Sequence, residues 1–483
     1  MKTTIMTIAA LACGLAATAE LPSHLPNPTL LIERDDTPVD AVSYFVSTDG
    51  SRTLQPNYFA LSDNGQSVDA TLTLDPSTKY QEIDGFGFAI TGSAAYNLLK
   101  MSAANRNSFL RKVFSHTDGY GCSYVRIPIG CSDFSLSEYT CCDTQGIGNF
   151  ALTDEETKYI IPVMKEILAI NPGVKVMSAP WTAPLWMKTN GQWTGGNLKR
   201  EYYQDYATYF VKWIQAFKAN GINITAVTPQ NEPLNRGNSA SMFMGWDEQR
   251  DFIKTALGPA LRQNGLSTQI WVYDHNYNYD NMADQQSYPT KIYADADAAQ
   301  YITGAAYHNY GGYLDELSKI HNANPDKQLL FTEWTAGTWS HGVGISEVIQ
   351  DTWALVLGIV KNWGRGAMVW NLMLDANRGP YRPGGCSTGN GAVDIDSSYS
   401  RITYNSFYYA MCLPSAVVKP GARRIGSSGS TNGLQFEAFR NADGTNAIVG
   451  YNESSKPLNL RINDGVNTFV VNIPVNTVAG FRW

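Results

Sequence analysis

Short apolar runs alternate with longer amphipathic segments between about residues 81 and 375, and this alternation limits the fold more than any other feature of the chain. Eight of the runs have the length and composition of strands, at 83–90, 124–129, 174–179, 224–230, 270–274, 302–307, 329–332 and 367–372. Strands that helices cover on both faces are expected to be apolar throughout, as these runs are. Eight strands that alternate with helices predict an α/β fold of the (β/α)8 TIM-barrel type rather than an open sheet.

The segments between the runs carry helical patterns. In segment 155–170 the apolar residues recur at helical spacing after the sequence Thr153-Asp154-Glu155-Glu156, which is typical of a helix N-terminus. Segment 202–220 repeats the pattern and ends at Gly221, and segments 251–263 and 346–361 follow the same scheme. These four segments are therefore predicted to be helices.

The chain is longer than a barrel requires. A barrel of this kind takes roughly 250 residues, and this chain has 483, of which 43% are hydrophobic and 16% charged. Residues 41–80 and 416–483 show short alternating runs separated by Gly, Asn and Ser turns, which indicates strands. We expect a β-sandwich beside the barrel, and we divide the chain into 1–19, a signal peptide; 20–80, which adds strands to the sandwich; 81–410, the catalytic barrel; and 411–483, the C-terminal sandwich.

The first residues have the features of an export signal. Lys2 precedes an apolar stretch, and Ala17-Thr18-Ala19 offers a cleavage site, so we expect a secreted, extracellular protein. Removal of this segment leaves six cysteines, an even number that suggests disulfides but fixes no pairing. Asn223 and Asn452 lie in acceptor sequences for N-glycosylation, with Asn452 the better candidate because Asn223 adjoins a predicted core strand.

Two predicted barrel strands end in a glutamate. Glu232 follows the fourth strand and Glu333 ends the seventh. The loops at the carboxyl ends of the strands form the active site of such barrels. Cleavage of an acetal requires one carboxylic acid to protonate the departing oxygen and one carboxylate to attack the anomeric carbon. The two glutamates therefore predict a glycosidase.

The motifs around these glutamates resemble those of glycoside hydrolase family 30. The matching segments are Asp84-Gly85-Phe86-Gly87, Arg126-Ile127-Pro128-Ile129-Gly130, Ser132-Asp133-Phe134-Ser135, Ser178-Ala179-Pro180-Trp181-Thr182-Ala183-Pro184, Asn231-Glu232-Pro233 and Phe331-Thr332-Glu333-Trp334. The resemblance covers nearly the whole chain after the signal peptide. It implies that Glu232 is the general acid/base and Glu333 the nucleophile of a retaining enzyme. We expect the charge of Glu333 to raise the pKa of Glu232 and keep it protonated.

The same resemblance assigns supporting roles. It implies that Arg126 keeps Glu333 ionised and that Asn231 hydrogen-bonds the 2-hydroxyl group of the sugar. Tyr310 resembles the tyrosine that hydrogen-bonds the nucleophile, although His308 or Tyr307 is an alternative inward-pointing residue. Three further residues match positions that hold the sugar at the point of cleavage: Asp133, Trp181 and Trp370.

The resemblance is greatest to the fungal endo-β-1,6-glucanases of the family, so we expect an endo-acting enzyme that cleaves β-1,6-glucan. Trp339 is a candidate for a leaving-group subsite. A glucosylceramidase or a xylanase with the same catalytic pair is the alternative within the family. A non-catalytic glucan-binding protein, which would need Trp181 and Trp370 but not both carboxylates, is the alternative of another class.

The partners follow from charge and chemistry. The net charge of −7, without a basic tract, makes nucleic acid and anionic lipid poor partners. The six histidines are scattered through the sequence, and we expect neither a metal nor another cofactor. The expected partner is a β-glucan polysaccharide or oligosaccharide, acted on by a monomer.

Overall fold

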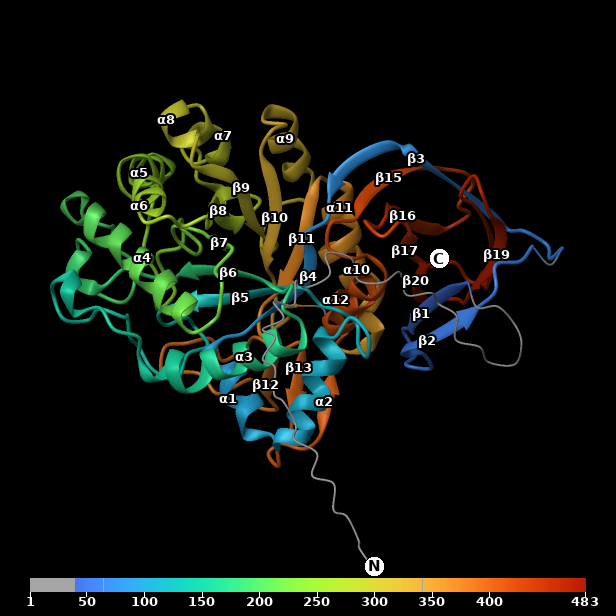
Figure 1. The fold of residues 1–483 in the computed structure, drawn as a ribbon, viewed down its shortest axis with the longest axis horizontal. Coiled ribbons are helices and arrows are strands. Elements are labelled where there is room, and N and C mark those ends of the chain that lie inside the picture. The colour runs from blue at the N-terminus through green and yellow to red at the C-terminus, as the bar shows by residue number, and fades with distance from the viewer. Residues whose placement is uncertain (1–39, 64, 341) are drawn as a thin grey trace, which may run out of the picture.

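The computed structural model describes residues 40–63, 65–340 and 342–483. Its centre is a closed barrel of eight parallel strands that follow one another in chain order, with the eighth paired to the first. The strands are β4 (Gly85–Ala89), β5 (Tyr124–Ile129), β6 (Lys175–Pro180), β7 (Ala226–Val227), β8 (Gln269–Asn276), β9 (Ile302–His308), β10 (Gln328–Glu333) and β11 (Gly364–Val369). The predicted barrel class is confirmed (Figure 1).

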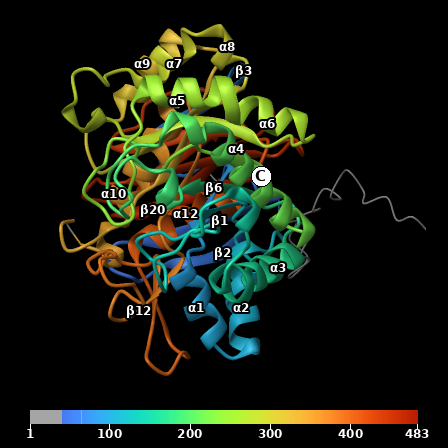
Figure 2. The same ribbon diagram turned by 90° about the vertical axis from the view of Figure 1, so that its left-hand side faces the viewer.

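Helices cover the outside of the barrel (Figure 2). In α4, for example, the apolar stripe that includes Tyr206, Phe210, Trp213 and Phe217 is buried. The helices are α1 (Gly92–Lys100), α2 (Ala103–Phe114), α3 (Ile161–Ile170), α4 (Tyr203–Ala219), α5 (Trp246–Phe252), α6 (Gly258–Gln263), α7 (Tyr288–Tyr293), α8 (Ala296–Ala299), α9 (Asp315–Ala323), α10 (Val348–Thr352), α11 (Gly358–Lys361) and α12 (Ser406–Val417). No helix in the described ranges is long and apolar enough to cross a bilayer.

Three of the predicted helices contain π-helical turns. The turns are Glu156–Ile160 before α3, Ile253–Leu257 between α5 and α6, and Trp353–Leu357 between α10 and α11. Pro162 and Pro259 lie two residues after the first two turns, and proline has no N–H with which to continue the α-helical hydrogen bonding. The predicted helical segments are therefore present, and three of them contain such a turn.

The fourth barrel strand is much shorter than the predicted run 224–230. Strand β7 has two residues, and Thr228 still donates its N–H to the carbonyl oxygen of Ser178 at 3.0 Å. Pro229 comes next and cannot donate to the ladder. The regular ladder ends at this point, and beyond it the N–H groups of Asn231 and Glu232 donate to Pro180 of β6 and Asp274 of β8.

Strands from both ends of the chain form one nine-stranded sheet, in the order β19-β18-β3-β15-β16-β17-β20-β1-β2. The rings of Phe59 on β2 and Phe469 on β19 lie 6.4 Å apart although these strands are the opposite edges of the sheet. The sheet is therefore curled around its own apolar core into the predicted sandwich (blue and red in Figure 1). Its strands are β1 (Ala41–Ser47), β2 (Thr53–Phe59), β3 (Ala70–Glu82), β15 (Arg423–Ser428), β16 (Leu434–Arg440), β17 (Asn446–Asn452), β18 (Leu458–Asn463), β19 (Thr468–Ile473) and β20 (Thr477–Arg482).

A small third sheet lies between barrel and sandwich in the sequence. It consists of β12 (Met373–Asp375), β13 (Val393–Ile395) and β14 (Ile402–Tyr404). Helix α12 follows it, spans the predicted domain boundary at residue 410, and is buried along its length between barrel and sandwich strands.

The expectations about disulfides and about the glycosylation site differ from the structure. The six cysteines of the described residues are free thiols, and the Sγ atoms of Cys122 and Cys412 lie 3.8 Å apart, too far for a bond. Asn452 is buried, and its Nδ2 donates to the carbonyl oxygens of Lys456 and Ile473, whereas Asn223 is exposed. The preference for Asn452 as the glycosylation site is therefore wrong. The predicted signal peptide at 1–19 lies outside the described residues.

Candidate active site

The barrel interior has two layers of side chains. The lower layer is an apolar cluster with one residue from each of β5 to β11: Tyr124, Met177, Ala226, Trp271, Ala306, Leu330 and Met368. Side chains two residues apart on a strand point to the same side. The next inward positions therefore form a second layer towards the carboxyl ends of the strands, and these positions are mainly polar: Arg126, Thr228, His308, Thr332 and Trp370.

Asp274 on β8 is the centre of the polar layer. Its carboxylate accepts hydrogen bonds from Arg126 at 3.0 Å, from Thr228 at 2.6 Å and from Thr332 at 2.6 Å, and it lies 3.1 Å from Nε2 of His308. Burial raises the pKa of Asp274, but the charge of Arg126 and the contact with His308 outweigh burial and hold the pKa well below its ordinary value. Asp274 therefore supplies a permanent negative charge beneath the cleft.

Glu333, at the end of β10, is held by a cation and a phenol. The Arg126 guanidinium donates to Oε2 of Glu333 at 2.5 Å, and the Tyr310 hydroxyl donates to Oε1 at 3.2 Å. Burial raises the pKa of Glu333, His308 and Arg126 lower it, and the nearby Glu232 raises it again, with a net rise. Arg126 is fully buried and also donates to Oδ1 of Asn231 at 2.7 Å, so it fixes both neighbours in place.

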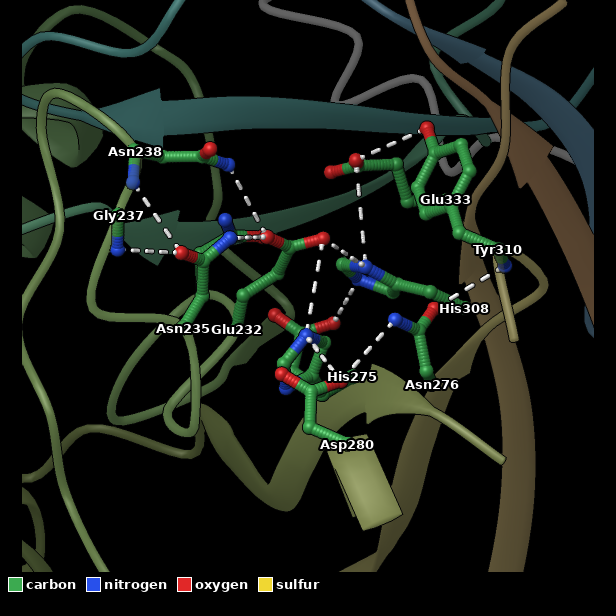
Figure 3. A network of polar contacts seen from close by, with 12 residues as sticks. Glu232, Asn235, Gly237, Asn238, His275, Asn276, Asp280, His308, Tyr310 and Glu333 are labelled. Atoms are coloured by element: carbon green, nitrogen blue, oxygen red, sulfur yellow. Dashed lines mark hydrogen bonds and ion pairs between the residues drawn. The ribbon is translucent and has the colours of Figure 1, made fainter. Parts of the chain in front are cut away.

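Glu232 has a backbone conformation that few non-glycine residues adopt. Its φ of 46° is in the left-handed region, and its N–H donates to the carbonyl oxygen of Asp274 at 3.0 Å. The Asn235 side-chain amide donates to Oε2 at 2.8 Å, and Nδ1 of His308 lies 3.3 Å from Oε1 (Figure 3). This conformation brings a residue outside the barrel strands over the polar layer.

The electrostatics of Glu232 differ from the sequence-based expectation. Burial raises the pKa of Glu232, but the charge of His275 and the hydrogen bonds from His308 and Asn235 lower it to about 2. The pKa of His308 is raised to about 9: burial lowers it, and the charge of Glu333 and the contacts with Asp274 and Glu232 outweigh burial. In the free enzyme the proton of this pair is therefore on the imidazole of His308 rather than on the carboxylate of Glu232.

The two glutamates face each other across a short gap. One carboxylate oxygen of Glu232, one of Glu333 and a ring nitrogen of His308 all lie within 4.8 Å of one another. Three such groups resemble the ligands of a metal ion. A protonated His308 has no lone pair for a metal, however, and Glu333 is already paired with the cation Arg126. The donor set therefore fits proton transfer better than metal binding.

Two indoles form a wall beside the gap. The rings of Trp181 and Trp370 stack with centroids 4.9 Å apart, and the Arg126 guanidinium lies 5.1 and 5.3 Å from their centres. The Trp370 indole N–H donates to Asp133 at 3.2 Å. Burial raises the pKa of Asp133 to about 7, with further contributions from the charges of Glu333 and Glu232.

Both glutamates and the two indoles border one cleft of about 510 Å³ at the carboxyl end of the barrel. Of the eight residues expected at the site, seven line the cleft, and the eighth, Arg126, lies buried beneath it. The seven are Asp133, Trp181, Asn231, Glu232, Tyr310, Glu333 and Trp370. Trp339, 53% exposed, also lines the cleft. Of the two alternatives to Tyr310, His308 also faces the glutamates, whereas the hydroxyl of Tyr307 lies 3.1 Å from that of Tyr279.

Sequence reasoning missed several polar neighbours of Glu232. Asn235 and Asn238 follow it in the same loop and approach Oε2, and Nε2 of His275 lies 4.0 Å from Oε1 and 3.5 Å from Asp280 (Figure 3). Asp274 and His275 lie near the carboxyl end of the fifth barrel strand, β8. Like the two glutamates, Asp274 and His275 are polar residues at the carboxyl end of a barrel strand, and this signal could have identified them.

A polar cleft with two facing carboxylates at the mouth of a (β/α)8 barrel defines a glycoside hydrolase. The family model of the glycosyl hydrolase family 30 TIM-barrel domain matches residues 83–410, and that of the family's beta sandwich domain matches residues 421–481. The chain belongs to glycoside hydrolase family 30, as its motifs predicted.

Its relatives include enzymes of more than one specificity. An endo-1,6-beta-D-glucanase of Neurospora crassa is 34% identical over 403 residues, 78% of this chain and 80% of that one. A lysosomal acid glucosylceramidase of Mus musculus is 30% identical over 91% of this chain and 88% of its own. The solved structure of the endo-beta1,6-glucanase BT3312 is 55% identical, with a TM-score of 0.90 over 92% of this chain and 99% of that one.

Proposed function

We propose that this protein is a retaining, endo-acting β-1,6-glucanase, with Glu333 as nucleophile and Glu232 as general acid/base. The observation that carries the mechanism is the gap of at most 4.8 Å between a carboxylate oxygen of Glu232 and one of Glu333. Retaining glycosidases have carboxyl groups about 5–5.5 Å apart, whereas inverting enzymes need roughly 6.5–9.5 Å to admit a water molecule.

In the first step, the Glu333 carboxylate attacks the anomeric carbon while the bond to the glycosidic oxygen breaks. Glu232 gives a proton to that oxygen, and the leaving sugar departs as an alcohol. In the free enzyme this proton is on His308, whose Nδ1 lies 3.3 Å from Glu232, so it reaches Glu232 along that contact. The product is an ester between the sugar and Glu333.

In the second step, water attacks the anomeric carbon of this ester and transfers a proton to Glu232 as the bond to Glu333 breaks. The two displacements each invert the anomeric carbon, so the β configuration is retained. Arg126 donates to the Glu333 oxygen at 2.5 Å and stabilises its negative charge each time the carboxylate is free.

The substrate assignment comes from the relatives and agrees with the cleft rim. A 55% identical structure and a 34% identical fungal relative are both endo-β-1,6-glucanases. Among the large exposed apolar residues of the described chain, those at the cleft are Tyr310 and Trp339, which are amphipathic aromatics suited to sugars. An aliphatic rim for a lipid tail is absent from the described residues of the cleft. The enzyme is proposed to be exported and to act on an extracellular glucan.

The test combines substrate choice with stereochemistry. β-1,6-Glucan, β-1,3-glucan, xylan and glucosylceramide are digested side by side, the products are sized, and the anomer released first is identified by NMR. We expect β-1,6-linked oligosaccharides of mixed length and initial release of the β-anomer. Glu333→Gln is expected to lower kcat on the order of a thousandfold or more, whereas Glu437→Gln on β16 serves as a control. Release of the α-anomer first, or digestion of xylan or glucosylceramide alone, contradicts the proposal.

A further inference from the structure

A second hollow, here called the rim hollow, lies beside the cleft at the same end of the barrel. Its volume is about 460 Å³, similar to that of the cleft. The loop after β8 supplies one side, and the loop after β9 with the first two turns of α9 supplies the other. The residues used below are Tyr277, Asn278, Gln286, Tyr313, Glu316 and Lys319.

The loops after β8 and β9 contribute residues to both the rim hollow and the cleft. Asn276 and Tyr310 line the cleft, whereas Asn278 and Gly312 line the rim hollow. The Tyr310 N–H donates to the Asn276 side chain at 3.0 Å (Figure 3), and the Asn278 N–H donates to Gly311 at 3.3 Å. A long ligand that leaves the cleft over this pair of loops therefore enters the rim hollow directly.

The rim hollow carries the kind of surface that binds a sugar face. Tyr313 is 82% exposed, so most of its side chain is accessible to a ligand. A tyrosine offers an apolar face and a polar edge, and thus matches a pyranose ring with its C–H face and its hydroxyl edge. Tyr310, 37% exposed, is a second aromatic ring on the same side of the cleft.

The charges of the rim hollow favour a neutral ligand. Lys319, the cation among its described lining residues, is paired with Asp315 at 3.1 Å and with Glu316 at 3.5 Å. An anionic ligand would therefore meet a negative surplus. The side-chain amides of Asn278 and Gln286 add neutral hydrogen-bonding groups, which a polyhydroxylated chain can use.

The floor of the rim hollow is held rigidly. The buried Tyr279 hydroxyl donates to Glu316 at 2.7 Å and lies 3.1 Å from the Tyr307 hydroxyl. Tyr277 stacks on Tyr307 with centroids 5.6 Å apart, and its buried hydroxyl has no hydrogen-bond partner among the described residues. A preformed surface loses little conformational entropy when it binds, which favours a binding role.

We propose that the rim hollow is a second binding site for β-glucan, occupied by a part of the polysaccharide beyond the sugars in the catalytic cleft. The proposal rests on the proposed function, because it takes the same substrate class. A ligand held at two linked sites binds more tightly than at either alone. The rim hollow should therefore matter for long chains and not for small substrates that fill only the cleft.

The kinetic test compares a long β-1,6-glucan with an aryl β-glucoside. Tyr313→Ala should raise KM for the long glucan roughly three- to tenfold, the range expected for loss of one aromatic contact, with kcat unchanged. Its kcat/KM for the aryl glucoside should stay at the wild-type value. Tyr313→Phe keeps the ring and should restore KM, and Tyr58→Ala, which removes an exposed tyrosine from the sandwich, is the control. An unchanged KM for the long glucan, or equal losses on both substrates, overturns the proposal.

A binding test separates this proposal from the proposed function. Glu333→Gln protein is run through gels that contain soluble β-1,6-glucan, with and without Tyr313→Ala. Retardation that weakens severalfold with Tyr313→Ala and not with Tyr58→Ala supports the rim hollow. Retardation that is equal in all variants refutes it, even if the wild-type enzyme hydrolyses the glucan. A wild-type enzyme that releases nothing from the glucan refutes the proposed function, whatever the retardation.

Discussion

His308 connects Glu232 to Asp274: its Nδ1 lies 3.3 Å from Oε1 of Glu232, and its Nε2 lies 3.1 Å from Oδ1 of Asp274. The imidazole is fully buried, and Nδ1 also lies 3.9 Å from Oε1 of Glu333. A single cation therefore touches three carboxylates, two of which are the proposed catalytic pair. The protonation of His308 influences the pKa values of both glutamates.

His308→Gln should narrow the pH profile of kcat/KM from both sides. Loss of the imidazolium raises the pKa of Glu333, so more alkaline conditions are needed to ionise the nucleophile and the acidic limb moves up. The proton that Glu232 gives to the leaving group is no longer stored on His308, whose pKa is about 9. It is therefore lost at lower pH, and the alkaline limb of the profile shifts to lower pH. At the optimum we expect a loss of roughly 10²-fold in kcat on glucan. His321→Gln on α9 is the control, and a profile of unchanged width argues against a proton on His308.

Glu232→Ala should distinguish substrates by their leaving groups. An acid is needed most when the departing oxygen is a poor leaving group, as in a glucan, and least for an activated aryl β-glucoside. We expect kcat/KM for the glucan to fall on the order of 10²- to 10⁴-fold. The rate of glycosyl-enzyme formation from the aryl substrate, measured as the burst of phenol, should fall much less. Asn238→Ala changes a neighbour that approaches Oε2 at 3.4 Å and serves as the matched control. Similar losses on both substrates would remove Glu232 from the acid role.

Arg126→Met should destabilise the fold as well as abolish activity. The guanidinium is fully buried and pairs with Asp274 and Glu333, so its removal leaves the buried carboxylates of Asp274, Glu333 and Glu232 with the imidazolium of His308 as their shared cation. Breaking a buried pair in this way costs roughly 3–5 kcal/mol in the free energy of unfolding, whereas an exposed pair contributes about 0–1 kcal/mol.

Urea denaturation of Arg126→Met and of a matched surface variant measures the difference. Arg461→Met breaks the partly exposed pair with Asp63 on the sandwich side and should change the free energy of unfolding by less than about 1 kcal/mol. Adding Asp274→Asn to Arg126→Met should recover part of the stability, because one unpaired charge is removed. Equal effects of the two arginine variants would mean that the buried charge cluster is not a coupled unit.

The barrel could be predicted because its pattern is local. Each strand and helix is recognisable from the apolar spacing of its own residues, and eight such pairs in order leave few topologies. The length of the fourth strand was predicted wrongly, because a proline changes the hydrogen bonding there. Pro229 ends β7 early, and Pro162 and Pro259 follow π-helical turns. These prolines were visible in the sequence, but their effect on register depends on the packing around them.

The site residues that lie at the carboxyl ends of regular strands could be predicted from the sequence. Glu232 and Glu333 could be found in this way, whereas Asp274 and His275 were not recognised. Tyr273 and Asp274 have φ values of 72° and 76°, and the register between β8 and β9 shifts between Tyr273 and His275. This irregularity brings Asp274 under the cleft and His275 beside Glu232. Sequence spacing alone does not reveal a left-handed pair of residues in a strand, and so it hid His275, one of the residues that lower the pKa of Glu232.

The cysteines offer a test that does not depend on activity. An exported chain with six cysteines suggested disulfides, but the described residues hold six free thiols, five of them buried. Unfolded without reductant, the protein lacking residues 1–19 should therefore react with a thiol reagent at six sites, and reductant should leave the melting temperature unchanged. Cys122 before β5 and Cys412 in α12, with their sulfur atoms 3.8 Å apart, are the pair that a change of rotamer could join. If only four thiols react, and the two unreactive ones are in the peptides that contain Cys122 and Cys412, this pair is oxidised. Cys122→Ser would then lower the melting temperature of the non-reduced protein and leave that of the reduced protein nearly unchanged.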